Sequence, residues 1–248
     1  FATSAPELLV SLVAAAEGAS GVSVGNILGS NVINIALVLG LSALIKPVTI
    51  NNQMIRRELP YMVAATILFW VLCMDGTLNR FDGFILITIL IVFLVYSVLT
   101  AKDGNNNKNN RSRKSYVLNG FLIIIGLIAI AYGADCVVDS AIFIARAFHF
   151  SDLFIGISIV AIGTSLPELA TSVVAAVKKQ SDISVGNVVG SNLFNICLVM
   201  GMVGLINPIQ INSNLNWFEF PAMVFITLLL YMFAFFSHKI NRIYGLIF

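Results

Sequence analysis

Apolar runs of about 20 residues alternate along this chain with short polar turns, the pattern of helices long enough to cross a bilayer. One polar, low-complexity stretch, Lys102–Lys114, divides the chain into two halves, and we expect it to be a flexible linker. The pattern predicts a partial helix from Phe1 to about Ala16, helices at about Val22–Leu44, Pro60–Met74, Phe84–Thr100, Tyr116–Arg146, Leu153–Val177, Ile183–Ile206 and Phe218–Phe236, and the start of a last helix near Ile240.

Within these apolar runs, one set of polar residues occurs twice in the same order. The offset between the copies is constant at 164 − 3 = 161 without a gap, and about half of the first 50 residues are identical to their counterparts. Self-similarity at a fixed offset indicates an internal duplication. The first copy comprises Thr3–Glu7, Gly25–Asn26 and Gly29–Asn34, and the second comprises Thr164–Glu168, Gly186–Asn187 and Gly190–Asn195.

Composition identifies the environment of these helices. Hydrophobic residues make up 58% of the chain and charged residues 10%, and the mean hydropathy is +0.95. Soluble domains carry about 25% charged residues, so this chain has too few charges to cover a water-facing surface. We predict a polytopic membrane protein. The net charge of +2 gives no reason to expect nucleic acid as a partner, and Cys73, Cys136 and Cys197 lie in apolar runs, as packing residues do.

The distribution of cations predicts the topology. Grouping alternate loops places twelve of the 14 Lys and Arg residues on one side and leaves only Arg80 and Arg146 on the other. The positive-inside rule makes the first side, with the central loop, cytoplasmic. The second Thr-Ser-x-Pro-Glu helix comes five spans after the first along the chain, an odd number, so the second copy enters the membrane from the opposite side. Inverted repeats of this kind are typical of transporters, whose substrate site lies between the repeats near the bilayer midplane.

The repeated residues predict where the chemistry lies. Glu7 and Glu168 lie inside apolar runs, where a charged side chain is costly and commonly functional. In each copy Thr precedes Glu, and Ser precedes Asn, by four residues, which places each pair on one helix face. The proline before each Glu cannot donate to the carbonyl four residues back, at Ala2 and Gly163. With carboxylates, amides, hydroxyls and carbonyls but no His or Cys, the set suits a hard cation such as Ca²⁺ or Na⁺.

Thr-Ser-x-Pro-Glu followed by Gly-Asn-x-x-Gly-Ser-Asn-x-x-Asn, present twice and inverted, resembles the alpha-repeats of the cation/calcium exchanger superfamily, and most closely its prokaryotic sodium/calcium exchanger-like members. The resemblance covers essentially the whole chain and implies an all-α fold of inverted repeats. About nine of the family's ten transmembrane helices would be present, the first of them partial. The expected repeats are residues 1–101, with the N-terminal helix missing, and 116–248, joined by the cytoplasmic loop 102–115.

The resemblance also implies a function and a ligand set. The function is secondary-active exchange of Ca²⁺ for Na⁺ by alternating access in a prokaryotic inner membrane. Tyr132–Asp135 resembles the gate helix of the second repeat. Some members have Asp where this chain has Asn34 or Asn195, which affects the ion ratio. The implied ion ligands are Thr3, Ser4, Glu7, Ser30, Asn34, Thr164, Ser165, Glu168, Ser191 and Asn195, with the Ala161 carbonyl as an outer ligand.

Several alternatives remain open at this point. A membrane glutamate can be a structural hydrogen-bonding residue, although two at matched places favour a site. Gly29 and Gly190 are interpreted as helix-packing residues, and Asn26 and Asn187 as either packing residues or supports for the ligands. The functional alternatives are an H⁺/Ca²⁺ or other cation exchanger, a passive cation channel and a membrane scaffold. The chain shows no enzyme motif and no nucleotide-binding loop, so we expect neither catalysis nor nucleotide binding. The oligomeric state is left open.

Overall fold

The computed structural model describes residues 3–101 and 156–248, together with isolated positions between 122 and 154. The predicted linker, Cys136 and almost all of the predicted Tyr116–Arg146 helix, including its gate motif apart from Tyr132, lie outside the described residues. Within them the chain is helical, which confirms the predicted fold class, with two short strand pairs in addition.

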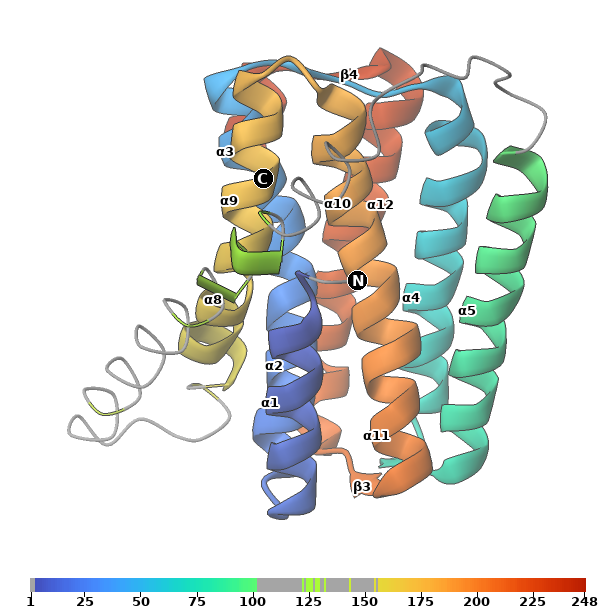
Figure 1. Cartoon of the computed structure of the whole chain (residues 1–248). Coiled ribbons are helices and arrows are strands. Elements are labelled where there is room, and N and C mark those ends of the chain that lie inside the picture. The colour runs from blue at the N-terminus through green and yellow to red at the C-terminus, as the bar shows by residue number, and fades with distance from the viewer. Residues whose placement is uncertain are drawn as a thin grey trace.

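The first half begins with α1 in the middle of the bundle and ends with α5 at its edge (Figure 1). Its second helical span is continuous from Ser20 to Ile45 and contains a π-helical segment, η1. The helices are α1 (Ala5–Ala16), α2 (Ser20–Ile33), η1 (Asn34–Leu39), α3 (Gly40–Ile45), η2 (Met54–Glu58), α4 (Leu59–Leu72) and α5 (Arg80–Ala101).

The second half repeats this arrangement. A continuous span from Ser181 to Ile206 again contains a π-helical segment, η4, which starts one residue before the counterpart of η1. The helices are η3 (Gly156–Val160), α8 (Ala161–Thr164), α9 (Leu166–Val177), α10 (Ser181–Leu193), η4 (Phe194–Met200), α11 (Gly201–Ile206), η5 (Ser213–Asn216), α12 (Glu219–Ser237) and α13 (Arg242–Ile247).

The predicted helix Leu153–Val177 is not one straight rod. The chain bends by 48° between α8 and α9, at Ser165. The cause lies two residues later, because Pro167 has no N–H to donate to the carbonyl of Gly163 and so weakens the helix at that turn. In the first half, Pro6 occupies the same place at the start of α1. The two prolines therefore place a helix break beside each motif glutamate.

The halves are inverted relative to each other. α1 packs against α2, and α9 packs against α10. From mid-height in Figure 1, α1 runs toward the end that carries β3, whereas α9 runs toward the end that carries β4. The opposite directions of these equivalent helices agree with the parity of the predicted spans.

Two antiparallel strand pairs, which the sequence did not predict, join the halves. β1 (Val48–Thr49) pairs with β4 (Lys239–Ile240), and β2 (Thr77–Leu78) pairs with β3 (Ile209–Gln210). Each pair combines one strand from each half, and the pairs lie at opposite ends of the bundle (Figure 1). The two halves are therefore linked by backbone hydrogen bonds at both ends.

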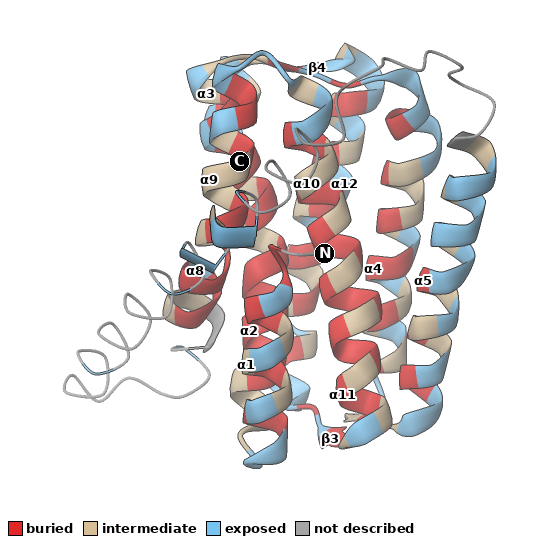
Figure 2. Ribbon diagram, in the orientation of Figure 1, coloured by how far each residue is buried: buried red, intermediate tan, exposed pale blue. Residues whose placement is uncertain are grey.

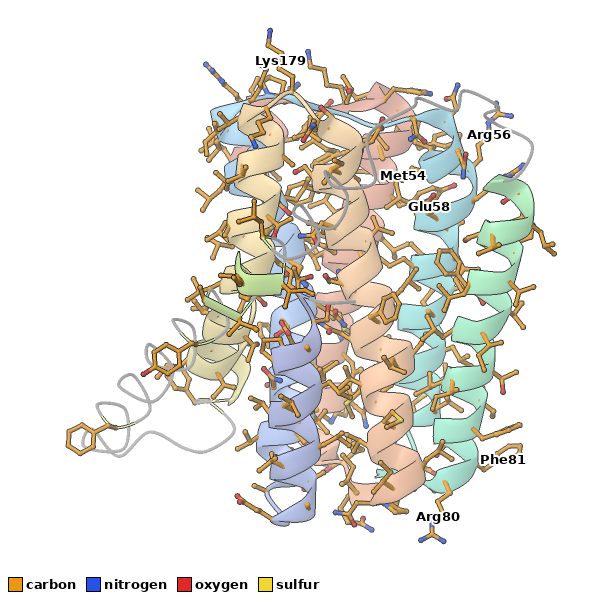
Figure 3. The ribbon with its side chains drawn as sticks, in the orientation of Figure 1. Met54, Arg56, Glu58, Arg80, Phe81 and Lys179 are labelled. Atoms are coloured by element: carbon orange, nitrogen blue, oxygen red, sulfur yellow. The ribbon has the colours of Figure 1, made fainter. Side chains whose placement is uncertain are left out.

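The surface of the bundle is suited to lipid. Within the described residues, four helices are long and apolar enough to cross a membrane, or five if the bent α8–α9 pair is one span. Exposed residues cover much of α5, while buried residues concentrate on the inward faces of the central helices (Figure 2). Phe84 on α5 is 61% exposed and Phe236 on α12 is 78% exposed. Arg56 and Lys179 lie at one end and Arg80 at the other, as the charge sorting predicts (Figure 3).

The N-terminus of α5 provides a test of local stability. Asp82 Oδ2 accepts a hydrogen bond from the backbone N–H of Asn79 at 2.9 Å, and Asn79 Oδ1 accepts from Phe81 N–H at 2.8 Å. We expect Asp82→Ala to lower the free energy of unfolding by about 0.5–2 kcal/mol, because it leaves a helix-terminal N–H without its partner. Thermal unfolding in detergent measures this. Asp82→Asn, which keeps an acceptor oxygen, should lose less, and equal losses in both variants would contradict the capping role.

Candidate ion-binding site

The residues predicted as ion ligands come together in the structure. All of them are buried, and Thr3, at 8% exposed, is the most accessible. Glu7 and Glu168 are both fully buried. They start α1 and α9, the two equivalent helices that run in opposite directions from mid-height (Figure 1). The predicted set therefore forms one buried cluster between the two repeats.

The threonines of each repeat contact the other repeat. Thr3 Oγ1 donates to Asn187 Oδ1 at 3.4 Å and lies 3.5 Å from Ser191 Oγ. Thr164 Oγ1 donates to Asn26 Oδ1 at 3.1 Å and lies 3.3 Å from Ser30 Oγ. These contacts are related by the same offset as the sequence motifs. Each half of the cluster is therefore completed by a hydroxyl from the opposite half.

Asn26 and Asn187, which the sequence analysis interprets as either packing residues or supports for the ligands, make matched hydrogen bonds. Asn26 Nδ2 donates to Ser11 Oγ at 3.0 Å and to the Glu7 carbonyl at 3.5 Å. Asn187 Nδ2 donates to Ser172 Oγ at 2.9 Å and to the Glu168 carbonyl at 3.2 Å. Each asparagine thus ties the helix that carries a glutamate to its neighbour.

Ser11 and Ser172 were missed by the sequence analysis. Both are fully buried and accept hydrogen bonds from the amides of Asn26 and Asn187. The signal for them was available, because they are a further identical pair at the same offset. Their position inside apolar helices made them resemble ordinary small packing residues.

The two carboxylates differ in their surroundings. Glu168 Oε1 accepts hydrogen bonds from Ser4 Oγ and Ser191 Oγ, each at 3.1 Å. Neither carboxylate oxygen of Glu7 receives a hydrogen bond from the described residues, although both oxygens are buried. The symmetry of the sequence therefore breaks at the two acidic groups.

Buried oxygens without a hydrogen-bond partner concentrate in this cluster. A buried polar atom left unpaired costs about 1–3 kcal/mol, and a charged one costs more. Such a group of electron-rich atoms matches the coordination chemistry of a cation, which prefers oxygen donors when it is hard. Among the described residues, the unpaired oxygens of the predicted ligands are Glu7 Oε1 and Oε2, Glu168 Oε2, Asn34 Oδ1, Asn195 Oδ1 and Ser165 Oγ.

The Ala161 carbonyl also lies among the predicted ligands. It accepts the helical hydrogen bond from Ser165 N–H at 3.2 Å, and Ser30 Oγ and Thr164 Oγ1 donate to it at 3.5 and 3.4 Å. Ala2, one of the two carbonyls that the prolines were expected to release, lies outside the described residues. Ala161 is therefore already engaged by hydroxyls, as an outer member of the cluster would be.

The surroundings of Gly190 and Gly186 are open among the described residues. A Cβ atom built on Gly190 would meet no other described atom within 4 Å, and at Gly186 the nearest is Met54 Cε at 3.7 Å. Close helix contact instead occurs elsewhere, at Gly83, Gly201 and Gly204. The close small-residue packing that the structure describes therefore lies between α5 and α11, and the packing role of Gly29 and Gly190 stays a prediction.

The donor set excludes some kinds of metal site. In the described part of the chain, no three His, Cys, Asp or Glu side chains are grouped to hold a metal ion. Cys73 and Cys197 are buried free thiols, consistent with packing residues. The cluster offers two carboxylates supplemented by hydroxyl and amide oxygens, a donor set for Na⁺ or Ca²⁺ and a poor one for zinc or copper.

Inverted helical repeats around a buried, oxygen-lined centre define the class of secondary membrane transporters. Within that class, the chain belongs to the sodium/calcium exchanger protein family, whose sequence profile it matches over residues 1–99 and 118–248. This confirms the family suggested by the repeated motif.

The chain aligns with individual relatives over most of its own length and most of theirs. The chain is 36% identical to inner membrane protein YrbG of Escherichia coli over 237 residues, which is 92% of this chain and 73% of YrbG. It is 32% identical over 286 aligned positions to sodium/calcium exchanger MaX1 of Methanosarcina acetivorans, covering 99% of this chain and 82% of MaX1. The solved structure of the sodium-calcium exchanger NCX_Mj matches with a TM-score of 0.83 at 37% identity, over 99% of this chain and 80% of that chain.

Proposed function

We propose that this protein is a secondary-active antiporter that exchanges Ca²⁺ for Na⁺ across a membrane by alternating access. The observation that carries the proposal is the group of buried, unpaired oxygens supplied by both repeats around Glu7 and Glu168. MaX1 and NCX_Mj, both named sodium/calcium exchangers, support the choice of ions.

The proposed ligands are the residues that the motif implies, from both repeats. The two carboxylates carry a formal charge of −2, which one Ca²⁺ or two Na⁺ would neutralise. Because the two kinds of ion would need the same carboxylates, binding of one displaces the other, and this competition is the physical basis of exchange. The amide oxygens of Asn34 and Asn195 add neutral donors of the kind that Ca²⁺ accepts in its six to eight oxygen ligands.

The proposed organisation follows the predicted repeats, residues 1–101 and 116–248, with the loop 102–115 in the cytoplasm of a prokaryotic cell. Arg56 and Lys179 at one end of the bundle support this orientation under the positive-inside rule, since only Arg80 lies at the other end among the cations that Figure 3 labels.

Ion exchange is tested with purified protein in lipid vesicles loaded with Na⁺. We expect rapid Ca²⁺ uptake when the external solution contains no Na⁺, because the outward Na⁺ gradient drives the counter-transport. Uptake should saturate with external Ca²⁺ and fall to the rate of protein-free vesicles when Na⁺ is equal on both sides. Conductive flux that needs no counter-ion would contradict an antiporter and favour the channel alternative.

An H⁺/Ca²⁺ exchanger is the second candidate. It is favoured by similarity to the Ca(2+)/H(+) antiporter ChaA of Bacillus subtilis, 29% identical over 211 residues. The same vesicles distinguish the two. Uptake that ignores the Na⁺ gradient and follows an imposed pH gradient would establish the second candidate and remove the first.

A further inference from the structure

We propose that Asn31 and Asn192, which the ligand set does not include, are positioning residues for Asn195 and Asn34. Each holds the amide nitrogen of an asparagine from the opposite repeat, so that the amide oxygen of that asparagine stays available to the ion. The inference rests on the proposed function, because it assigns these residues a task at the same ion site.

The hydrogen bonds cross between the repeats. Asn34 Nδ2 donates to Asn192 Oδ1 at 3.0 Å, and Asn195 Nδ2 donates to Asn31 Oδ1 at 3.4 Å. All four side chains are at most 1% exposed, so no bulk water competes for these bonds. The Oδ1 atoms of Asn34 and Asn195 have no hydrogen-bond partner among the described residues, while their Nδ2 atoms do.

An asparagine side chain has a donor end and an acceptor end of nearly equal size, so its shape alone does not fix which end faces a ligand. A cation binds the amide oxygen and is repelled by the NH₂ group. An acceptor on the other side of the amide therefore decides the orientation, because turning the amide over would set two oxygens against each other. Asn31 and Asn192 supply these acceptors.

The positioning residues are themselves oriented by their own NH₂ groups. Asn192 Nδ2 donates to the backbone carbonyl of Asn31 at 3.2 Å, and Asn31 Nδ2 donates to Met223 Sδ at 3.6 Å. A carbonyl is a stronger acceptor than a thioether. Asn192 is therefore the more firmly held of the two, in line with its shorter bond to Asn34, and its loss should have the larger effect.

A packing role for Asn192 predicts a different result from a positioning role. Leucine branches at the same atom as asparagine, although it is somewhat larger, and it would fill these buried positions without supplying an acceptor. If Asn192 only fills space, Asn192→Leu should bind Ca²⁺ as the unaltered protein does. If Asn192 orients Asn34, the same variant lets the Asn34 amide turn over.

The experiment measures equilibrium binding of radiolabelled Ca²⁺ to the purified full chain, with monodispersity and thermal unfolding as checks of the fold. We expect Asn192→Leu to weaken Ca²⁺ binding about 10–100-fold, the usual range for residues that orient metal ligands. In exchange assays the half-saturating Ca²⁺ concentration should rise. In an Asn34→Ala background the same substitution should cost almost nothing, because its target is gone. In an Asn195→Ala background it should keep its full effect.

Asn31 supplies a second and independent pair of variants. Asn31→Leu should weaken Ca²⁺ binding through Asn195, whereas the same substitution in an Asn195→Ala background should cost almost nothing. This pair decides the matter if Asn192→Leu does not fold.

Unchanged Ca²⁺ affinity in Asn192→Leu, or an equal loss with and without the Asn34 side chain, overturns the positioning role and leaves the proposed function intact. If the unaltered protein binds no Ca²⁺, the proposed function fails, and the positioning role fails with it.

Discussion

Glu168→Gln is expected to remove Ca²⁺ exchange while the protein still folds. The substitution keeps the shape of the side chain and an oxygen for the hydroxyls of Ser4 and Ser191, which donate to Glu168 at 3.1 Å. It removes one of the two negative charges that the site offers to a divalent ion. Losing one partner of a buried charge pair costs about 2–5 kcal/mol, so Ca²⁺ binding should weaken at least about 30-fold. Glu7→Gln should act in the same direction.

The measurement is Na⁺-driven Ca²⁺ uptake into vesicles, with thermal unfolding in detergent without Ca²⁺ as the check of the fold. Either variant should unfold at the same temperature as the unaltered protein or higher, because a buried carboxylate without a cation beside it opposes folding. The matched control is Glu17→Gln, an exposed residue at the end of α1, which should exchange normally. Full activity of Glu7→Gln or Glu168→Gln would show that the site is wrongly assigned.

Gly83→Ala is expected to destabilise the whole bundle. A Cβ on Gly83 of α5 would lie 2.6 Å from the carbonyl oxygen of Gly201 and 2.7 Å from the backbone nitrogen of Leu205. Both obstacles are backbone atoms of α11, so no side chain can turn aside. Gly204 packs back against the same part of α5, with Asn79 O 2.9 Å from where its Cβ would be. Separating the two helices should cost about 1–3 kcal/mol, the usual range for overpacking.

Unfolding in detergent measures this loss, and Gly21→Ala is the matched control. Gly21 also lies in a helix, but a Cβ built there meets no other described atom within 4 Å. Alanine in an open helical position should stabilise slightly, by about 0.5–1 kcal/mol. Equal stability of Gly83→Ala and the unaltered protein would mean that α5 and α11 can move apart at no cost.

Much of the site was predictable because its motif occurs twice in the sequence. Glu7 and Glu168 stood out as charges in apolar runs, and the constant offset gave each predicted ligand a partner. The same offset predicted Asn26 and Asn187 as candidates without fixing their role. The spacing of residues along one helix predicts only which of them share a face of that helix. It could indicate that Thr3 and Glu7 share a face, but not that Thr3 contacts Asn187, a residue 184 positions away.

The parts that could not be predicted depend on contacts between distant segments. The pairing of β1 with β4 involves two residues from each strand, too few to leave a pattern in either segment. The bend at Ser165 had a visible cause in Pro167, yet the apolar run continued past it and indicated one helix. The two carboxylates differ in the hydrogen bonds that they accept, and the sequence could not predict this difference because the motif around them is the same.

The positions of the π-helical segments bear on how the duplicated chain evolved. η1 begins at Asn34, and η4 spans the counterparts of η1 from Asn195 to Met200. Another π segment, η2 (Met54–Glu58), has no such counterpart, because the corresponding stretch near Leu215 forms a 3₁₀ turn. A wide turn that occurs at the same place in both copies is most simply inherited from the single ancestral unit before it was doubled. The irregular backbone beside Asn34 and Asn195 is then older than the two-repeat protein.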